Sequence, residues 1–350
     1  MITSSESSRR EFLGALGAGV AAAGALAAPT ETAAQGAAPL KIVDFHNHYI
    51  DPSWTLTGAD RLPPAARAAR EAIHRNMQSW SALITSIETA GIAARVINSP
   101  TAFIEDADGN VPAGATRRIN DQMAEFVGKH PGKLLGLATV DPFSGEDGAR
   151  ELTRAVRELG LRGAFVESAR RDLLLGAKET RPTLAAAAAL NVPVFVHPQT
   201  DPELHKRFSR TGRVGLRFAR GTINSATLIS MLETGSFDEN PKLQIVMTTL
   251  AMGGLFLAGG FGDGMRIRSD APALTRRHVY VDTMGLNPAQ VRAAVDLLGA
   301  DHVLMGTDWP IIEERSVPER LKNALVHCGL NPAEQQMVAG GNTLRLLGAA

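Results

Sequence analysis

Short runs of apolar residues recur along the chain, and segments with a helical period of apolar and polar residues lie between most of them. Eight runs have the length and composition of buried strands: Ile42–Phe45, Ala94–Asn98, Leu134–Val140, Gly163–Val166, Pro193–Val196, Leu243–Met247, His278–Val281 and Val303–Met305. The helical period covers Thr116–Lys129, Gly148–Leu159, Arg181–Leu190, Pro288–Leu298 and Pro318–His327, and Pro332–Leu347 predicts a terminal helix. This alternation predicts an α/β fold, a (β/α)8 TIM barrel that forms a single domain over residues 41–350.

Two connections between the predicted strands are long. One runs from Asp51 to Gly91 and contains a helical pattern over Pro64–Ala90, and the other runs from Thr200 to Asn240. Long loops on a barrel usually cover the active site. We therefore expect these two connections to decide the substrate.

The first 34 residues have the pattern of a signal peptide that is removed after export. Ser8-Arg9-Arg10-Glu11-Phe12-Leu13 matches the twin-arginine pattern, and the uncharged stretch Leu13–Ala28 follows it. That stretch is too short and too weakly apolar for a membrane span, so no stable membrane anchoring is expected. The segment predicts the twin-arginine export machinery as a partner and a periplasmic or secreted protein.

Charge and cysteine content exclude several classes of protein. The 36 basic and 36 acidic residues balance, so the composition gives no indication of a nucleic-acid partner. Cys328 is the single cysteine, which rules out an intramolecular disulfide. These features leave a small-molecule substrate as the expected ligand.

Residues that bind metals follow three of the predicted strands. His46 and His48 lie two apart at the end of the first strand and therefore point the same way, His197 follows the fifth strand and Asp308 follows the eighth. The carboxyl ends of barrel strands share one face, where such enzymes keep their chemistry. Three imidazoles and a carboxylate suit one divalent metal ion, Zn²⁺ first, with Mn²⁺, Fe²⁺ or Co²⁺ as alternatives.

The same motifs resemble those of the amidohydrolase superfamily, in the branch that includes aminocarboxymuconate-semialdehyde decarboxylase. The resemblance rests on these segments: Asp44–His48, His130–Lys133, Val194–Pro198, Gly306–Pro310 and Gly341–Leu347. It implies that His46, His48, His197 and Asp308 hold one metal ion and that Asp308 also moves protons. Related barrels often pair, which implies a homodimer.

The chain departs from that family at the end of the sixth strand, where a histidine is usual and Thr249 stands instead. A threonine hydroxyl can hydrogen-bond a water or substrate oxygen, but it is far too weak an acid to serve as a general base near neutral pH. His74 and His205, in the two long connections, are the histidines that could replace it. We favour the simpler interpretation that both are solvated surface residues.

Two further carboxylates are expected to face the cavity. Glu167 ends the fourth strand and is a candidate substrate contact or proton carrier, with a salt bridge to Arg170 or Arg171 as the alternative. Asp282 ends the seventh strand, and its alternative role is to orient a metal-bound histidine.

The predicted chemistry is hydrolysis, in which an activated water attacks an ester, lactone or amide and the catalytic residues are Asp308, Glu167 and Thr249. The alternative is metal-dependent decarboxylation of an aromatic or unsaturated carboxylic acid, in which Asp308 delivers a proton to the carbon that loses CO2. A third hypothesis is a periplasmic binding barrel that has lost catalysis, and the replacement by Thr249 is its support.

Overall fold

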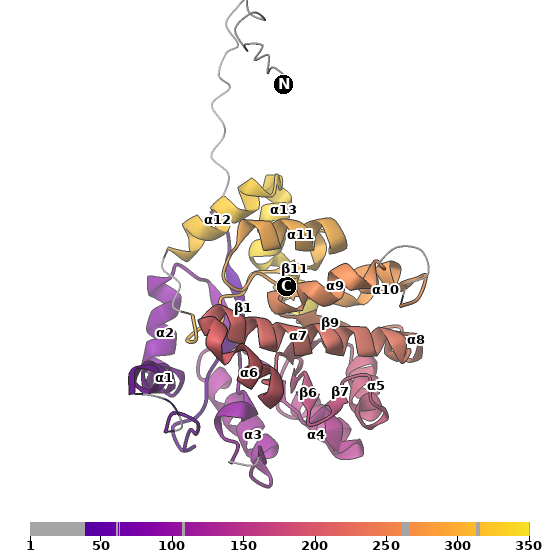
Figure 1. The fold of residues 1–350 in the computed structure, drawn as a ribbon. Coiled ribbons are helices and arrows are strands. Elements are labelled where there is room, and N and C mark those ends of the chain that lie inside the picture. The colour runs from indigo at the N-terminus through magenta and orange to yellow at the C-terminus, as the bar shows by residue number, and fades with distance from the viewer. Residues whose placement is uncertain are drawn as a thin grey trace, which may run out of the picture. The chain divides into compact units, whose positions relative to one another are not determined.

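The computed structural model describes residues 39–60, 62, 64–106, 109–260, 267–312 and 316–349 (Figure 1). The predicted export signal, residues 1–34, lies outside these ranges. Among the described residues, no helix is both long and apolar enough to cross a membrane.

The strands form the predicted parallel barrel. Its strands are β1 (Val43–His48), β2 (Ala94–Asn98), β3 (Leu134–Gly136), β4 (Ala138–Thr139), β5 (Ala164–Glu167), β8 (Val194–His197), β9 (Ile245–Met247), β10 (Val279–Asp282) and β11 (Val303–Leu304). Hydrogen bonds join β1, β2 and β3 in one sheet and β4, β5, β8, β9, β10 and β11 in another. The two halves β3 and β4 of one predicted strand link these sheets, because Leu137 between them donates its N–H to Ile97 O at 3.0 Å.

Backbone hydrogen bonds also close the ring on its other side. Phe45 N–H donates to Met305 O and His48 N–H to Trp309 O, both at 2.8 Å. The first and eighth strands are therefore neighbours, and the (β/α)8 barrel predicted from the sequence is confirmed. A short antiparallel hairpin, β6 (Ala169–Arg170) with β7 (Leu173–Leu174), follows the fourth barrel strand.

The predicted barrel helices are present, with bounds that shift by at most two residues. They are α3 (Ala115–Gly128), α4 (Glu146–Arg157), α5 (Arg181–Leu190), α11 (Pro288–Leu298) and α12 (Val317–His327). The terminal helix is not continuous: a π-helical turn at Met337–Gly341 separates α13 (Pro332–Gln336) from α14 (Asn342–Leu346). The sequence analysis did not predict α9 (Met252–Ala258) and α10 (Ala271–His278), and α10 takes the residue His278 that we assigned to a strand. It also predicted no helix in the connection Thr200–Asn240.

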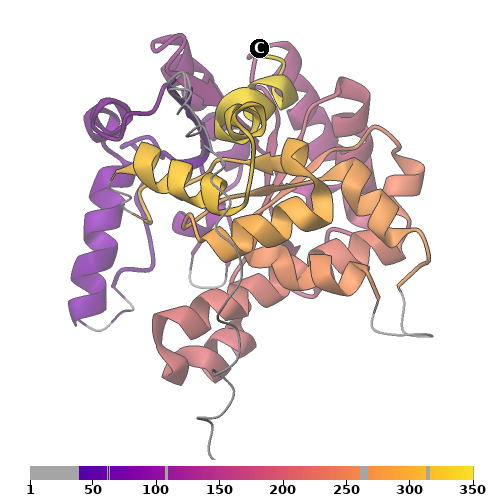
Figure 2. The ribbon, with the colours of Figure 1, turned by 90° about the horizontal axis from the view of Figure 1, so that it is seen from above.

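Both long connections fold into helices. The first contains α1 (Pro64–Met77) and α2 (Trp80–Thr89), and the second contains α6 (Pro202–Phe208), α7 (Gly212–Glu233) and α8 (Ser236–Glu239). Helix α6 and the first turns of α7 extend away from the helices that surround the sheet, as Figure 2 shows in salmon. The remainder of α7 runs back along the barrel and packs against α9.

The barrel interior is filled by large apolar side chains from several strands, among them Phe45, Phe165 and Phe195. The register of β1 against β2 shifts between Asp44 and Asn47, which marks a bulge. As a result the rings of two consecutive residues, Phe45 and His46, both contact Phe195, with centroid distances of 5.1 and 4.8 Å. The bulge therefore turns His46 into the barrel directly above the apolar core.

Candidate metal centre

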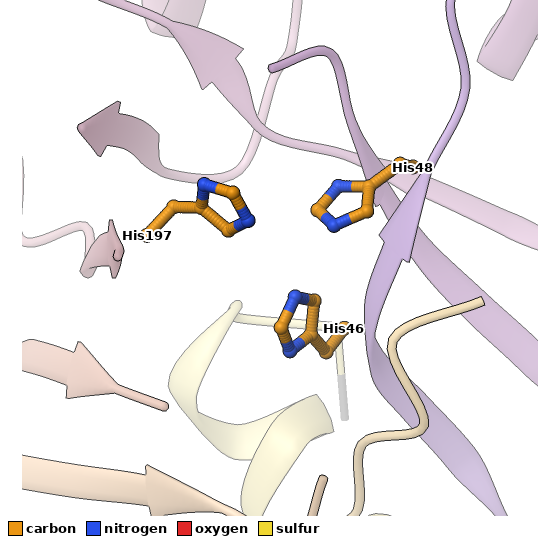
Figure 3. A group of neighbouring side chains, drawn as sticks. All are labelled: His46, His48 and His197. Atoms are coloured by element: carbon orange, nitrogen blue, oxygen red, sulfur yellow. The ribbon is translucent and has the colours of Figure 1, made fainter. Parts of the chain in front are cut away.

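Three imidazoles converge at the carboxyl ends of β1 and β8. Figure 3 shows His46 and His48 on one side of a common space and His197 on the other. Their candidate ligand nitrogens all lie within 4.8 Å of one another, and all three side chains are buried. Two nitrogens that bind one ion at about 2.0–2.1 Å lie at most about 4.2 Å apart, so small shifts of these side chains would bring all three onto a single ion.

The carboxylate of Asp308 lies beside the imidazoles of His46 and His48. Its Oδ1 atom is 3.1 Å from His48 Nε2 and 3.4 Å from His46 Nε2. The residue has a left-handed backbone, with φ of 69°, and donates its N–H to His46 O at 2.9 Å. The structure therefore brings together the four predicted metal ligands from the first, fifth and eighth strands.

Each imidazole uses its Nδ1 atom to bind a side-chain oxygen outside the common space. His46 Nδ1 donates to Asp282 Oδ2 at 2.6 Å, His48 Nδ1 to Asn98 Oδ1 at 2.7 Å and His197 Nδ1 to Glu167 Oε2 at 3.0 Å. A neutral imidazole with its proton on Nδ1 presents the lone pair of Nε2, which is the form that binds a metal.

The donor set fits a divalent cation. His46 Nε2 is buried and accepts or donates no hydrogen bond among the described residues, and such an orphaned atom is unusual in a folded protein. Burial lowers the pKa of His48, and burial together with the Arg220 guanidinium holds the pKa of His197 well below its ordinary value. Neutral imidazoles are the metal-binding form, so these shifts favour ligation at neutral pH.

At two residues of the site, His46 and Asp308, neighbouring charges outweigh the effect of burial on the pKa. Burial alone would lower the pKa of His46, but Asp308 and Asp282 outweigh it and raise that pKa. Burial alone would raise the pKa of Asp308, but His46, His48 and Arg220 outweigh it, so the pKa lies below the ordinary value. Asp308 is therefore an anion in this site.

Glu167 has a different partner from those predicted. Its carboxylate binds the ligand His197, whereas Arg170 pairs with Asp141. Burial and the nearby Glu105 raise the pKa of Glu167 to about 8. Glu167 also lines a cavity of about 1050 Å³ between the loops that follow β2, β4, β5 and β8, so it orients a ligand and faces a space that a substrate could enter.

Asp282 has the orienting role that the sequence analysis gave as its alternative. Besides His46, its carboxylate accepts the N–H of Thr249 at 2.9 Å through Oδ1. Thr249 begins a short 3₁₀ turn after β9 and is buried. The contact that the structure shows for Thr249 is therefore made by its backbone.

The two histidines of the long connections differ. His205 lies exposed on α6, as expected. The expectation of a solvated His74 is wrong, because this side chain is buried on α1 against the ring of Phe103. No local pattern in the sequence predicts this burial, because Phe103 lies in another connection, in the turn after β2.

The sequence analysis missed one residue of the site, Arg220 on α7. Its guanidinium donates two hydrogen bonds to Pro198 O, at 2.7 and 3.0 Å, and its NH2 group lies 3.4 Å from His197 Nε2. Charge interactions with Asp308 and Glu167 also reach this side chain. No motif surrounds Arg220, and its place follows from the return of the 22-residue helix α7 across the barrel end.

Comparison with known proteins gives the family. Residues 43–349 match the amidohydrolase family over nearly the whole described chain. The chain belongs to this family. Within it, the match to γ-resorcylate decarboxylase from Polaromonas sp. is 26% identical over 258 residues, 69% of this chain and 78% of the relative.

Other similar amidohydrolases include 2-amino-3-carboxymuconate-6-semialdehyde decarboxylase from Dictyostelium discoideum, 24% identical over 240 residues, 66% of this chain and 65% of the relative. Among solved structures, 5-carboxyvanillate decarboxylase from Novosphingobium aromaticivorans superposes with a TM-score of 0.74 at 19% identity, covering 89% of this chain and 97% of that one. That protein was crystallised with manganese and 4-hydroxy-3-methoxy-5-nitrobenzoic acid. The likeness shows the same barrel fold.

Proposed function

We propose that this chain is a metal-dependent decarboxylase of a small aromatic carboxylic acid. The observation that carries the proposal is the convergence of His46, His48, His197 and Asp308 beside the guanidinium of Arg220. The decarboxylase relatives support it. Hydrolysis, the reaction we first expected, becomes the second candidate.

The residues around the site favour decarboxylation over hydrolysis. A hydrolase needs a base to take a proton from water and an acid to protonate the leaving group. Thr249 stands where the usual histidine would supply one of these, and its backbone is what contacts Asp282. Decarboxylation needs one proton delivered to one carbon, which a single carrier such as Asp308 can perform.

His46, His48, His197 and Asp308 would hold the metal ion. When bound there, a divalent cation would polarise the carboxylate of the substrate and a neighbouring hydroxyl. We propose Mn²⁺ ahead of Zn²⁺, because the structurally similar decarboxylase was crystallised with manganese and imidazole with carboxylate suits either ion.

Asp308 carries the proton in this scheme. Its anion accepts the proton of the substrate hydroxyl and transfers it to the ring carbon that bears the carboxylate. The bond between this carbon and the carboxylate then breaks, CO2 leaves, and the electron pair returns to the ring as a phenolate, which takes a proton from solvent. Asp308 ends in its starting state.

Arg220 balances the charge of the bound acid. Its NH2 group lies 3.4 Å from the nitrogen of His197 that a metal would use. A metal ion held by that nitrogen and the guanidinium of Arg220 would repel each other unless an anion lay between them. A substrate carboxylate is such an anion, so Arg220 would direct the carboxylate to the metal and hold it there.

The test is a comparison of products on the full chain loaded with Mn²⁺. We expect CO2 release from 2,6-dihydroxybenzoate or related hydroxybenzoates, with incorporation of one solvent deuteron into the ring, and no turnover of a lactone and ester panel. The His46→Ala/His48→Ala variant is the control and should release no CO2. Hydrolysis of a lactone or ester without CO2 release would replace this proposal with the hydrolase, and binding without any turnover would favour the lapsed barrel.

A further inference from the structure

Two basic side chains of α1 stand side by side over the ring of Phe103. Arg70 and His74 are one helical turn apart and therefore share a face of the helix. The Arg70 guanidinium carbon lies 5.4 Å from the ring centroid, and the His74 ring packs against the edge of Phe103 at 5.6 Å. Phe103 belongs to the short turn Thr101–Phe103 that follows β2, so both basic groups lie at the end of the barrel that holds the metal ligands.

Neither basic group forms an ion pair with a carboxylate among the described residues, although the charge of Glu71 acts on His74. His74 is 9% exposed, and its Nε2 atom is buried with no hydrogen-bond partner among the described residues. The half-buried Arg70 forms no ion pair or side-chain hydrogen bond with any residue that the structure describes. A buried donor without a partner costs free energy, and a buried cation costs more.

The charge of a third cation acts on this pair. Burial, followed by the charge of Arg220, lowers the pKa of Arg70. Arg220 is itself balanced in part by Asp308 and Glu167, whereas no carboxylate of a described residue forms an ion pair with Arg70. The positive charges from α1 and α7 therefore disfavour each other when no anion lies between them.

An anionic ligand would remove both costs. Arginine and histidine N–H groups bind carboxylates with short, charge-assisted hydrogen bonds. Arg220 is held by Pro198 O beside His197 and so faces the reacting group. Arg70 and His74 are placed on another element, over an aromatic ring against which a substrate ring could pack.

We propose that Arg70 and His74 form a subsite for a second carboxylate of the substrate, remote from the one that reacts, so that this chain acts on aromatic dicarboxylic acids. The proposal rests on the function proposed above, because it assigns the first carboxylate to the metal centre. It also gives the buried His74 a role. This role differs from that of the histidine that is usual at the end of the sixth strand and that Thr249 replaces. His74 would bind the substrate rather than move the catalytic proton.

The test measures binding to the Mn²⁺-loaded full chain by calorimetry. The probes are 4-hydroxyisophthalate and 2-hydroxybenzoate, which share the hydroxyl and its neighbouring carboxylate and differ in the second carboxylate. We expect wild-type protein to bind the dicarboxylate about 10- to 100-fold more tightly, the range for charge-assisted hydrogen bonds at a buried site. Arg70→Gln should abolish this difference, His74→Phe should reduce it, and both should leave 2-hydroxybenzoate binding within about twofold.

Arg75→Gln is the matched control, because Arg75 lies exposed on the same helix. It should retain the full preference for the dicarboxylate, and a cooperative thermal unfolding transition should show that both variants are folded. Equal binding of the two probes by wild-type protein, or an equal loss for both probes in Arg70→Gln, would overturn the subsite. If the preference is present but no substrate releases CO2, the subsite stands and the decarboxylase proposal fails.

Discussion

A single buried carboxylate, Asp282, organises one side of the candidate metal centre. Through Oδ2 it accepts the Nδ1 proton of His46 at 2.6 Å, and through Oδ1 it accepts the N–H groups of Thr249 and Met284 at 2.9 and 3.1 Å. Both oxygens are thus bound, and the His46 ring is fixed with Nε2 toward the other ligands. Partners of this kind set the orientation and basicity of a metal-bound histidine.

Replacement of this carboxylate should weaken the metal site. In Asp282→Asn we expect metal affinity to fall by about 10- to 100-fold, because the neutral amide no longer favours the Nδ1 tautomer of His46. Competition with a chelator of known affinity measures the change. The control is Asp296→Asn, which removes a half-exposed partner of Arg292 and should bind metal as the wild type does. An equal metal affinity in Asp282→Asn and Asp296→Asn would show that Asp282 has no orienting role.

The two residues at the ends of the sixth and eighth strands should differ sharply. Asp308→Asn removes the proton carrier, so we expect turnover to fall by roughly 10²–10⁴. Thr249→Val keeps the backbone N–H that binds Asp282 and should cost about one hydrogen bond, roughly 0.5–1.5 kcal/mol in activation free energy.

The measurement is the steady-state rate of Asp308→Asn and of Thr249→Val at matched metal content. If Thr249→Val proves as damaging as Asp308→Asn, the Thr249 hydroxyl holds a water or substrate group that the reaction requires. If Asp308→Asn is nearly silent, Glu167 is the next candidate carrier, because it faces the adjoining cavity.

At the scale of elements, a buried ion pair joins the strands that carry the ligands. Arg95 on β2 pairs with Asp44 on β1 at 2.5 Å, and the side chains are 2% and 0% exposed. Asp44 also accepts the backbone N–H of Thr307 at 3.0 Å and its hydroxyl at 2.6 Å. The pair therefore attaches the segment that contains Asp308 to the strand that contains His46 and His48.

Removal of one member should destabilise the whole barrel. In Arg95→Met the carboxylate of Asp44 stays buried without its cation, so we expect the free energy of unfolding to fall by roughly 3–5 kcal/mol. Urea unfolding measures it. The double variant Arg95→Met/Asp44→Asn should recover part of the loss. Lys133→Met, which breaks an exposed pair with Glu88, should leave the free energy of unfolding almost unchanged. An equally small change in Arg95→Met would contradict the argument.

At the scale of the whole molecule, several histidines are buried in forms that resist protonation. Burial is the largest cause in each case, and it holds the pKa below the ordinary value of 6.5 at His48, His74, His197 and His278. Between pH 6.5 and the lower folded pKa values, the unfolded chain binds more protons than the folded chain. The stability that these histidines contribute is therefore fully present above pH 6.5. It is lost as the pH falls through their folded pKa values, because proton uptake then favours the unfolded chain.

We expect the buried histidines to lower the unfolding midpoint of chelator-treated protein as the pH falls from 7 to 5. The raised pKa values of His46, Glu167, Asp44 and Glu105 work in the opposite direction, so the contribution of one histidine is isolated by substitution. His278→Gln should lose less stability than the wild type over this range, and His327→Gln, at an exposed position, is the matched control. An equal pH dependence of the midpoint in His278→Gln and the wild type would contradict the prediction.

The predicted export signal belongs to the full chain rather than to the barrel. Arg9 and Arg10 precede an uncharged apolar stretch, and we propose that they direct twin-arginine translocation to the periplasm. Arg9→Lys/Arg10→Lys should leave the protein in the cytoplasm, and subcellular fractionation measures this. Periplasmic accumulation equal to that of the wild type would exclude the signal.

The sequence by itself determined the barrel and the identity of the four candidate ligands. Buried parallel strands have a short apolar signature, and each metal-binding residue directly follows one of them, so position along the chain predicts position at the barrel end. The orienting role of Asp282 was available for the same reason, since it ends β10.

Only the tertiary structure decided which residues surround these ligands. The burial of His74 and the approach of Arg220 to His197 depend on how the two long connections fold back over the barrel, and the bulge in β1 depends on its pairing with β2. Contacts between residues that are far apart in the chain leave no periodic or local pattern, because they result from the packing of whole helices. The ligand set was therefore predictable, whereas the cations that would select the substrate were not.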